Sequence, residues 1–279
     1  MMRGMFAAIS GLKNHQTLLD VVSNDIANVN TVGYKSSRAT FADSLNQLQR
    51  GASGATAGTG GANAAQVGLG VKLNSIDNLM SSGALQSTGN PLDVAITGDG
   101  FFRVSTATTG DPLVPDAGSV QYTRAGNFTT NSDGYLVTQD GYYVTGRAAA
   151  GTTGADQTIK IPDGGTDVSI AQDGAVSYVD TAGARQTAGY ISLATFPNAP
   201  GLERIGSNRW IQSANSGGET AGTPGNGSGF LNPGALEMSN VDLAQAFTTM
   251  ITAQRGYQAN SRAISTADQM LEELVNLKH

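Results

Sequence analysis

Apolar residues recur at intervals of three and four positions in the last 39 residues of the chain. Such spacing predicts a long amphipathic helix with a heptad seam. Ser239 and Asp242, just ahead of the pattern, resemble a capping box. The seam positions, seven of which are apolar, are Leu243, Phe247, Met250, Gln254, Tyr257, Ser261, Ile264, Asp268, Leu271 and Val275.

The first 30 residues carry the same spacing. A second apolar flank, which includes Phe6 and Val22, widens the stripe. Asn30 and Gly33 are expected to end this helix, because both residue types tolerate the left-handed turn of a C-cap. The positions in the N-terminal seam are Met5, Ile9, Leu12, Gln16, Leu19 and Ile26.

Each terminal helix has more apolar surface than a single contact would cover. The two helices could form an antiparallel pair whose remaining apolar flanks meet neighbouring subunits. They could equally be two ordinary helices that cover one face of the interior, and the pattern alone leaves both interpretations open. The first interpretation gives a candidate assembly interface made of Ile9, Leu12, Leu19, Ile26, Phe247, Met250, Tyr257, Ile264 and Leu271.

The interior of the chain is dominated by strand and turn signals. Residues 41–50 are compatible with a short helix, residues 51–61 have the composition of a flexible linker, and residues 67–73 alternate as a strand does. From residue 90 to about 215, short alternating segments are separated by five Asp-Gly pairs. Asp-Gly favours hairpin turns, so we expect mainly antiparallel strands.

These patterns predict an α+β fold with three regions. Residues 1–30 and 241–279 form a terminal helical domain, paired as an antiparallel coiled coil. Residues 31–89 and 216–240 form an extended connecting region, and residues 90–215 form a β-rich outer domain.

The composition excludes several classes of function. A net charge of −6 argues against a nucleic-acid groove, and the absence of Cys excludes disulfides and thiolate metal sites. The two histidines, His15 and His279, make neither a Ser-His-Asp triad nor a histidine metal site. The candidate carboxylates are Asp93, Asp99, Asp133 and Asp140. Three of the four lie in or beside turn signals, where Asp serves local hydrogen bonds. We therefore expect that the protein is not an enzyme and that it binds no cofactor, metal or small-molecule substrate.

Four stretches together resemble the bacterial flagellar rod and hook family. They are residues 5–41, 88–104, 122–141 and 239–277, which cover much of the chain. The most specific is an Asn-rich helix end followed by Thr-x-Gly-aromatic-Lys. Besides Thr31, its motif residues are Asn24, Asn28, Asn30, Gly33, Tyr34 and Lys35.

The resemblance implies a structural subunit that self-associates into a hollow helical tube. Such subunits leave the cell through the flagellar type III export apparatus without a cleaved signal peptide, and residues 1–16 accordingly lack an A-x-A cleavage site. The resemblance also implies paired helices on the inner wall, an outer β domain, and contacts with other axial proteins of the rod, cap and hook–filament junction.

Within the family, residues 48–77 and 253–271 resemble the short form of the hook protein. The expected function is therefore a subunit of the curved extracellular hook, the universal joint that links rod to filament. The alternative is the distal rod protein, which forms the straight drive shaft in the basal body. A remote alternative of a different class is a secreted carbohydrate-binding β protein with helical ends that oligomerise.

Overall fold

The computed structural model describes residues 2–55, 58, 60–109, 114–115, 119–151 and 156–276. The chain divides into two compact units. The first, called here the helical unit, consists of Met1–Ala27, Ser37–Asp77 and Asp242–His279. The second, the β unit, consists of Asn28–Ser36 and Asn78–Val241. The expected connecting region 31–89 is thus divided between the two units.

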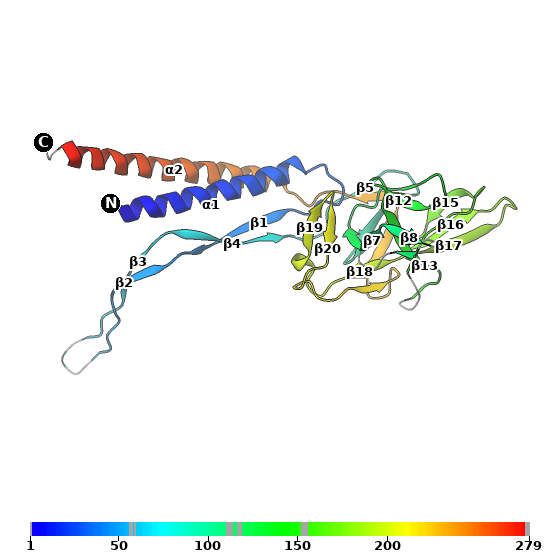
Figure 1. Ribbon diagram of the computed structural model, residues 1–279, viewed down its shortest axis with the longest axis horizontal. Helices are drawn as coiled ribbons and strands as arrows, with labels where there is room; N and C mark the ends of the chain where they lie inside the picture. The colour runs from blue at the N-terminus through cyan, green and yellow to red at the C-terminus, as the bar shows by residue number, and fades with distance from the viewer. Residues whose placement is uncertain are drawn as a thin grey trace. The chain divides into compact units, whose positions relative to one another are not determined.

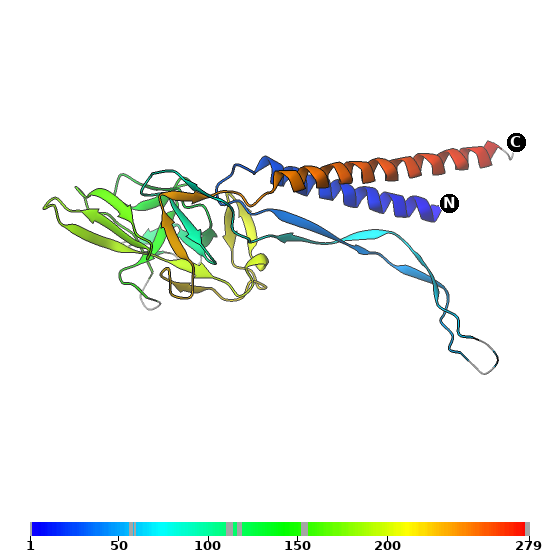
Figure 2. The same cartoon turned by 180° about the vertical axis from the view of Figure 1, so that it is seen from behind.

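Two long helices form one part of the helical unit. Helix α1 (Met2–Ala27) and helix α2 (Leu243–Asn276) lie side by side and run in opposite directions (Figures 1 and 2). Asp242 caps α2, because its carboxylate accepts hydrogen bonds from the backbone N–H of Ala244 at 2.8 Å and of Gln245 at 3.2 Å. The expected capping box was therefore wrong: the Ser239 hydroxyl accepts from Val241 instead.

A two-part β ribbon completes the helical unit. Strand β1 (Ser37–Asp43) pairs with β4 (Val71–Asn78), and β2 (Asn46–Arg50) pairs antiparallel with β3 (Ala65–Gly68). The short helix expected over residues 41–50 was wrong, because pairing across the ribbon satisfies the backbone of this segment. Part of the glycine tract 51–61 lies outside the described residues.

The β unit is built on one large sheet. Its main path runs through β15 (Thr166–Ile170), β16 (Ala175–Val179), β17 (Arg185–Ile191), β13 (Tyr143–Arg147), β7 (Phe101–Ser105), β10 (Gln121–Thr123), β20 (Arg209–Ile211) and β19 (Glu203–Gly206). Five strands join off this path: β11 (Phe128–Thr130), β12 (Leu136–Thr138), β14 (Gln157–Thr158), β18 (Leu193–Thr195) and β21 (Thr220–Gly222). The pairings between neighbours are antiparallel.

Smaller strand pairs complete the β unit. They are β6 (Val94–Thr97) with β22 (Phe230–Pro233), β5 (Leu85–Ser87) with β23 (Ala235–Glu237), and β8 (Ala107–Thr109) with β9 (Val114–Pro115). A short 3₁₀ helix, η1, spans Ala199–Gly201. The glycines of all five Asp-Gly pairs have positive φ, as turns at these pairs require. The α+β class with mostly antiparallel sheets is confirmed.

The two units differ in what they bury. The β unit has a core of large side chains, including Phe102, Phe128 and Leu136, and a second cluster around Trp210. In the helical unit, the apolar side chains that are buried among the described residues are all small: Ala8, Val22, Ala253 and Ala267. Neither described helix is long and apolar enough to cross a membrane. The helical unit therefore keeps most of its large apolar side chains at its surface.

Candidate assembly interface

The candidate interface residues fall into two groups by exposure. The four on α1, namely Ile9, Leu12, Leu19 and Ile26, are half-buried. On α2, Met250, Ile264 and Leu271 are also half-buried, whereas Phe247 is 50% exposed and Tyr257 is 36% exposed. Only part of the heptad seam therefore lies toward α1, and Phe247 and Tyr257 lie outside the buried face.

The buried face of α2 differs from the sequence-based seam. Its most enclosed positions are Ala253 and Ala267, with Gly256 and Asn260 half-buried between them. Hydrophobic spacing missed this face because Gly, Ala and Asn give no apolar signal. The signal that could have found it is the recurrence of small residues at intervals of three and four.

Large apolar side chains are exposed across the helical unit. On the helices they include Phe6 at 61%, Ile251 at 51% and Val275 at 64% exposure. On the ribbon they include Leu45 at 72% and Leu48 at 57%. Burying each such side chain would contribute about 1.5–3 kcal/mol. Contiguous apolar patches on a protein surface are typical of interaction sites.

The motif loop, residues 28–36, follows α1 and belongs to the β unit. Its Lys35 is 1% exposed, and the Lys35 ammonium donates to the Glu237 carboxylate at 2.6 Å and to the Ser81 carbonyl at 2.9 Å. The other oxygen of Glu237 accepts from the Arg124 guanidinium at 3.2 Å. Two buried cations thus share one buried carboxylate. Burial lowers the pKa of Lys35, the Glu237 carboxylate opposes that shift, and Arg124 adds to it.

Gly33 lets the motif loop come close to the β unit. It has φ +68°, and a Cβ there would lie 2.6 Å from the backbone nitrogen of Ala125. Its N–H donates to the Glu237 carbonyl at 2.8 Å. A larger residue would be strained and would collide with backbone, so the sequence needs glycine here.

An arginine joins the next motif residue to the core of the β unit. The Arg204 guanidinium lies 4.9 Å from the ring centre of Tyr34 and 4.7 Å from that of Trp210, which are cation–π distances. Arg204 also donates to the Lys35 carbonyl. Of the asparagines in the motif, Asn28 is half-buried and bonded to Thr31, whereas the other two, Asn24 and Asn30, are exposed. The buried half of the motif therefore binds the loop to its own β unit.

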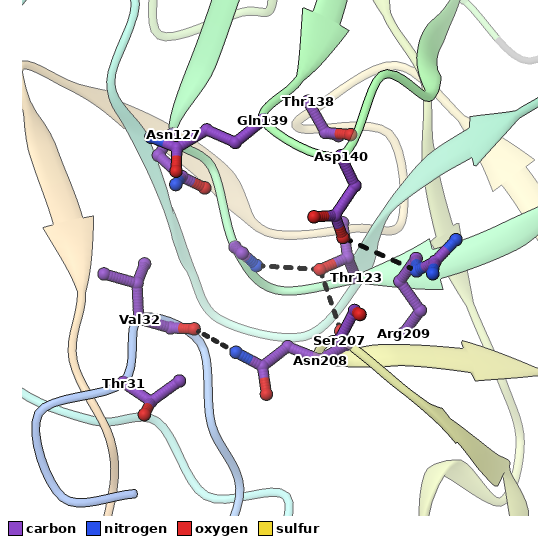
Figure 3. Close-up of a pocket in the computed structure, with 11 residues that line it drawn as sticks. Thr31, Val32, Thr123, Asn127, Thr138, Gln139, Asp140, Ser207, Asn208 and Arg209 are labelled. Atoms are coloured by element: carbon purple, nitrogen blue, oxygen red, sulfur yellow. Dashed lines mark hydrogen bonds and ion pairs between the residues drawn. The ribbon is translucent and has the colours of Figure 1, made fainter.

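A hollow of about 330 Å³ opens beside the motif loop (Figure 3). Thr31 and Val32 form one wall, and the Asn208 amide donates to the Val32 carbonyl at 2.9 Å. Asp140 and Arg209 lie opposite each other, with 3.9 Å between carboxylate oxygen and Nε. The described lining has no His, Cys or Lys.

A second charge network lies within the β unit, around the buried Arg103. Arg103 pairs with Asp156 at 2.6 Å and with Glu219 at 3.0 Å, and the Tyr122 hydroxyl donates to Glu219 at 2.7 Å. Burial, together with the hydrogen bond to Glu219, raises the pKa of Tyr122 well above its usual range. Among the described residues, no three potential ligands are close enough to hold a metal ion.

Three family descriptions match separate parts of the sequence. "Flagella basal body rod protein" matches residues 5–35, "Flagellar hook protein FlgE/F/G D1 domain" matches 95–178, and "Flagellar basal body rod FlgEFG protein C-terminal" matches 232–277. A "Flagellar basal-body rod protein FlgG" of Bacillus subtilis is 50% identical over 280 residues, which cover all of both chains. The chain belongs to the flagellar rod and hook protein family.

As a member of this family, the protein is a structural component of the flagellar basal body or hook. These structures are built from axial proteins that self-assemble. The expectation that it is not an enzyme is confirmed by the family. The FlgG protein of Caulobacter vibrioides is 40% identical over 281 residues, with 99% of this chain and all of the relative covered. The hook protein FlgE of Borreliella burgdorferi is 27% identical over 453 residues, with both chains fully covered. These comparisons favour the distal-rod alternative over the hook interpretation.

Proposed function

We propose that this chain is a subunit of the distal rod, the straight drive shaft of the flagellum. One observation carries the proposal: the two FlgG relatives named above are 50% and 40% identical over 280 and 281 positions, nearly the 279 residues of this chain. The alignment with the hook relative spans 453 positions at 27% identity, so it contains long gaps. The hook subunit stays the second candidate.

For the polymer we propose that α1 and α2 form an antiparallel coiled coil on the inner wall of a tube. The interface residues from Ile9 to Ile26 and from Phe247 to Leu271 then contact either the partner helix or a neighbouring subunit. The exposure of Phe247 and Tyr257 supports contacts between subunits for these two. Residues 1–30 and 241–279 form this wall, 31–89 and 216–240 connect it, and 90–215 form the outer domain.

We further propose that the subunit passes through the flagellar export apparatus without a cleaved signal and assembles in the basal body. Its neighbours are copies of itself and other axial proteins of the rod and hook. The net charge of −6 and the low charged fraction of 14% are compatible with close packing of copies. No nucleic acid, cofactor or small-molecule substrate takes part.

Electron microscopy of the purified polymer tests the assignment. A rod subunit forms straight tubes, whereas a hook subunit forms curved ones. Curved tubes of normal length in a strain that carries only this gene in place of its hook gene would overturn the distal-rod assignment. Failure to form any tube, together with glycan binding by the folded chain, would support the remote carbohydrate-binding alternative.

A further inference from the structure

Two glycines, one on each helix, receive a polar side chain from the opposite helix. A Cβ built on Gly11 would lie 2.8 Å from the amide nitrogen of Asn260. A Cβ built on Gly256 would lie 2.6 Å from the His15 ring. Real Cβ atoms essentially never come this close to other atoms. A Cβ at either glycine would force the facing Asn260 or His15 side chain to shift, so each polar side chain occupies space that the glycine leaves open.

The two contacts are reciprocal and define one register. In an antiparallel pair, the residue numbers of facing positions have a constant sum. Gly11 with Asn260 and His15 with Gly256 both give 271. The same register sets Leu18 opposite Ala253, a large residue opposite a small one. The burial of Ala253, which is 1% exposed, agrees with that placement.

Within the described part of the chain, the contact region also contains buried polar atoms without hydrogen-bond partners, which lower the stability of the helix pair. The amide nitrogen of Asn14 and Nδ1 of His15 are buried without a hydrogen-bond partner among the described residues. An unpaired buried polar atom is destabilising. Polar residues at helix interfaces are best known for fixing register at the expense of stability.

We propose that His15 and Asn260, each seated on a glycine of the other helix, form a register lock for the helix pair. Shifted by one heptad, the pair would bring Asn260 against Leu18 and His15 against Ala263, and both side chains would lose their glycine. The shift would move α1 along α2 by about 10 Å. The exposed apolar stripes of the two helices would then be displaced relative to each other along the helix axis. This consequence for assembly rests on the proposed function.

Disulfide trapping in the full chain tests the lock, and the natural absence of Cys makes the background clean. The in-register pair is Leu18→Cys with Ala253→Cys, whose numbers sum to 271, and the pair for the shifted register is Ala8→Cys with Met270→Cys, whose numbers sum to 278. Under mild oxidation, the in-register pair should close within one chain and the shifted pair should not. Adding His15→Ala and Asn260→Ala should reduce the ratio of the two closures by about tenfold, the effect of roughly one lost buried contact.

Three outcomes would overturn the lock. They are no closure at the in-register pair, equal closure of both pairs in the parent chain, and an unchanged ratio after the lock residues are removed. Gly256→Ala should reduce in-register closure, whereas Gly4→Ala is the matched control, since a Cβ there meets nothing within 4 Å. The exchange His15→Gly with Gly256→His should restore closure. Closure is read from a single chain, so it distinguishes failure of the lock from failure of the rod assignment.

Discussion

Replacing Glu237 by Gln should be among the most destabilising isosteric changes in the β unit. The side chain of Glu237 is fully buried and accepts from Lys35 at 2.6 Å, from Arg124 at 3.2 Å and from the Gly83 N–H at 2.9 Å. Glutamine keeps the volume but removes the negative charge, which leaves two buried cations without a counter-charge. Removing one member of a buried ion pair costs about 3–5 kcal/mol. That is a large share of the ~5–15 kcal/mol by which a domain is stable.

Lys35→Met provides the comparison. It removes one cation, and the Glu237 carboxylate keeps its contact with Arg124, so the expected loss is smaller, about 1–3 kcal/mol. The double variant Lys35→Met with Glu237→Gln should lose less than the sum of the two, because the single variants break the same contact. Glu203→Gln, an exposed position of the same unit, is the matched control and should change stability by less than about 0.5 kcal/mol.

Urea titration followed by Trp210 fluorescence measures these free energies. Trp210 is the single tryptophan, is 1% exposed and lies in the β unit, so its signal reports unfolding of that unit. With a slope of about 2 kcal/mol per molar urea, Glu237→Gln should lower the midpoint by about 1.5–2.5 M. A loss below about 1 kcal/mol, or a loss smaller than that of Lys35→Met, would refute the reasoning.

Three further predictions concern other parts of the chain. Tyr122 keeps its proton in the folded state above pH ~10, where an unfolded tyrosine loses it, so the free energy of unfolding should fall by up to ~1.4 kcal/mol per pH unit. Tyr122→Phe should lessen this slope between pH 10 and 11. Urea midpoints that fall equally steeply with pH in the parent chain and the variant would contradict the prediction. Leu271→Asp should give exported but unpolymerised protein, with the exposed Glu272→Asp as control, and normal polymer on micrographs would disprove it. Limited proteolysis of the monomer should trim both terminal helices and leave a fragment containing residues 90–215; protected ends on mass spectrometry would count against that.

The sequence predicted the features of the fold that depend on local patterns. Both helices and the strand-rich interior were expected, because apolar spacing and Asp-Gly turns act over a few residues. The segment 41–50 failed for the same reason: its local pattern allowed a helix, and only its pairing partners at 65–78 make it extended. Local preference is weak compared with such tertiary contacts.

The candidate site was only partly accessible from the sequence. The spacing rule selected large residues such as Phe247, which is exposed, and passed over Gly256 and Asn260 on the buried face. The motif residue Lys35 was found by resemblance, yet its partner Glu237 is 202 positions away. A single sequence carries no signal for a pairing at that distance, because nothing in it distinguishes Glu237 from the chain's other carboxylates as the partner of Lys35.

One cluster of hydrogen bonds determines where the chain enters and leaves the β unit. The Asn240 side chain accepts from the Ser36 N–H at 2.8 Å and donates to the Leu79 carbonyl at 2.8 Å, and the Leu79 N–H donates to the Ser36 carbonyl at 2.8 Å. Three of the four points where the chain passes between the units lie beside these residues. Insertions are tolerated best where the two ends of a segment lie close together. Residues 79–240 therefore leave and rejoin the rest of the chain at one place, and a segment of another length inserted there would keep the path of the chain only if it also supplied the motif loop with partners such as Glu237 and Arg204.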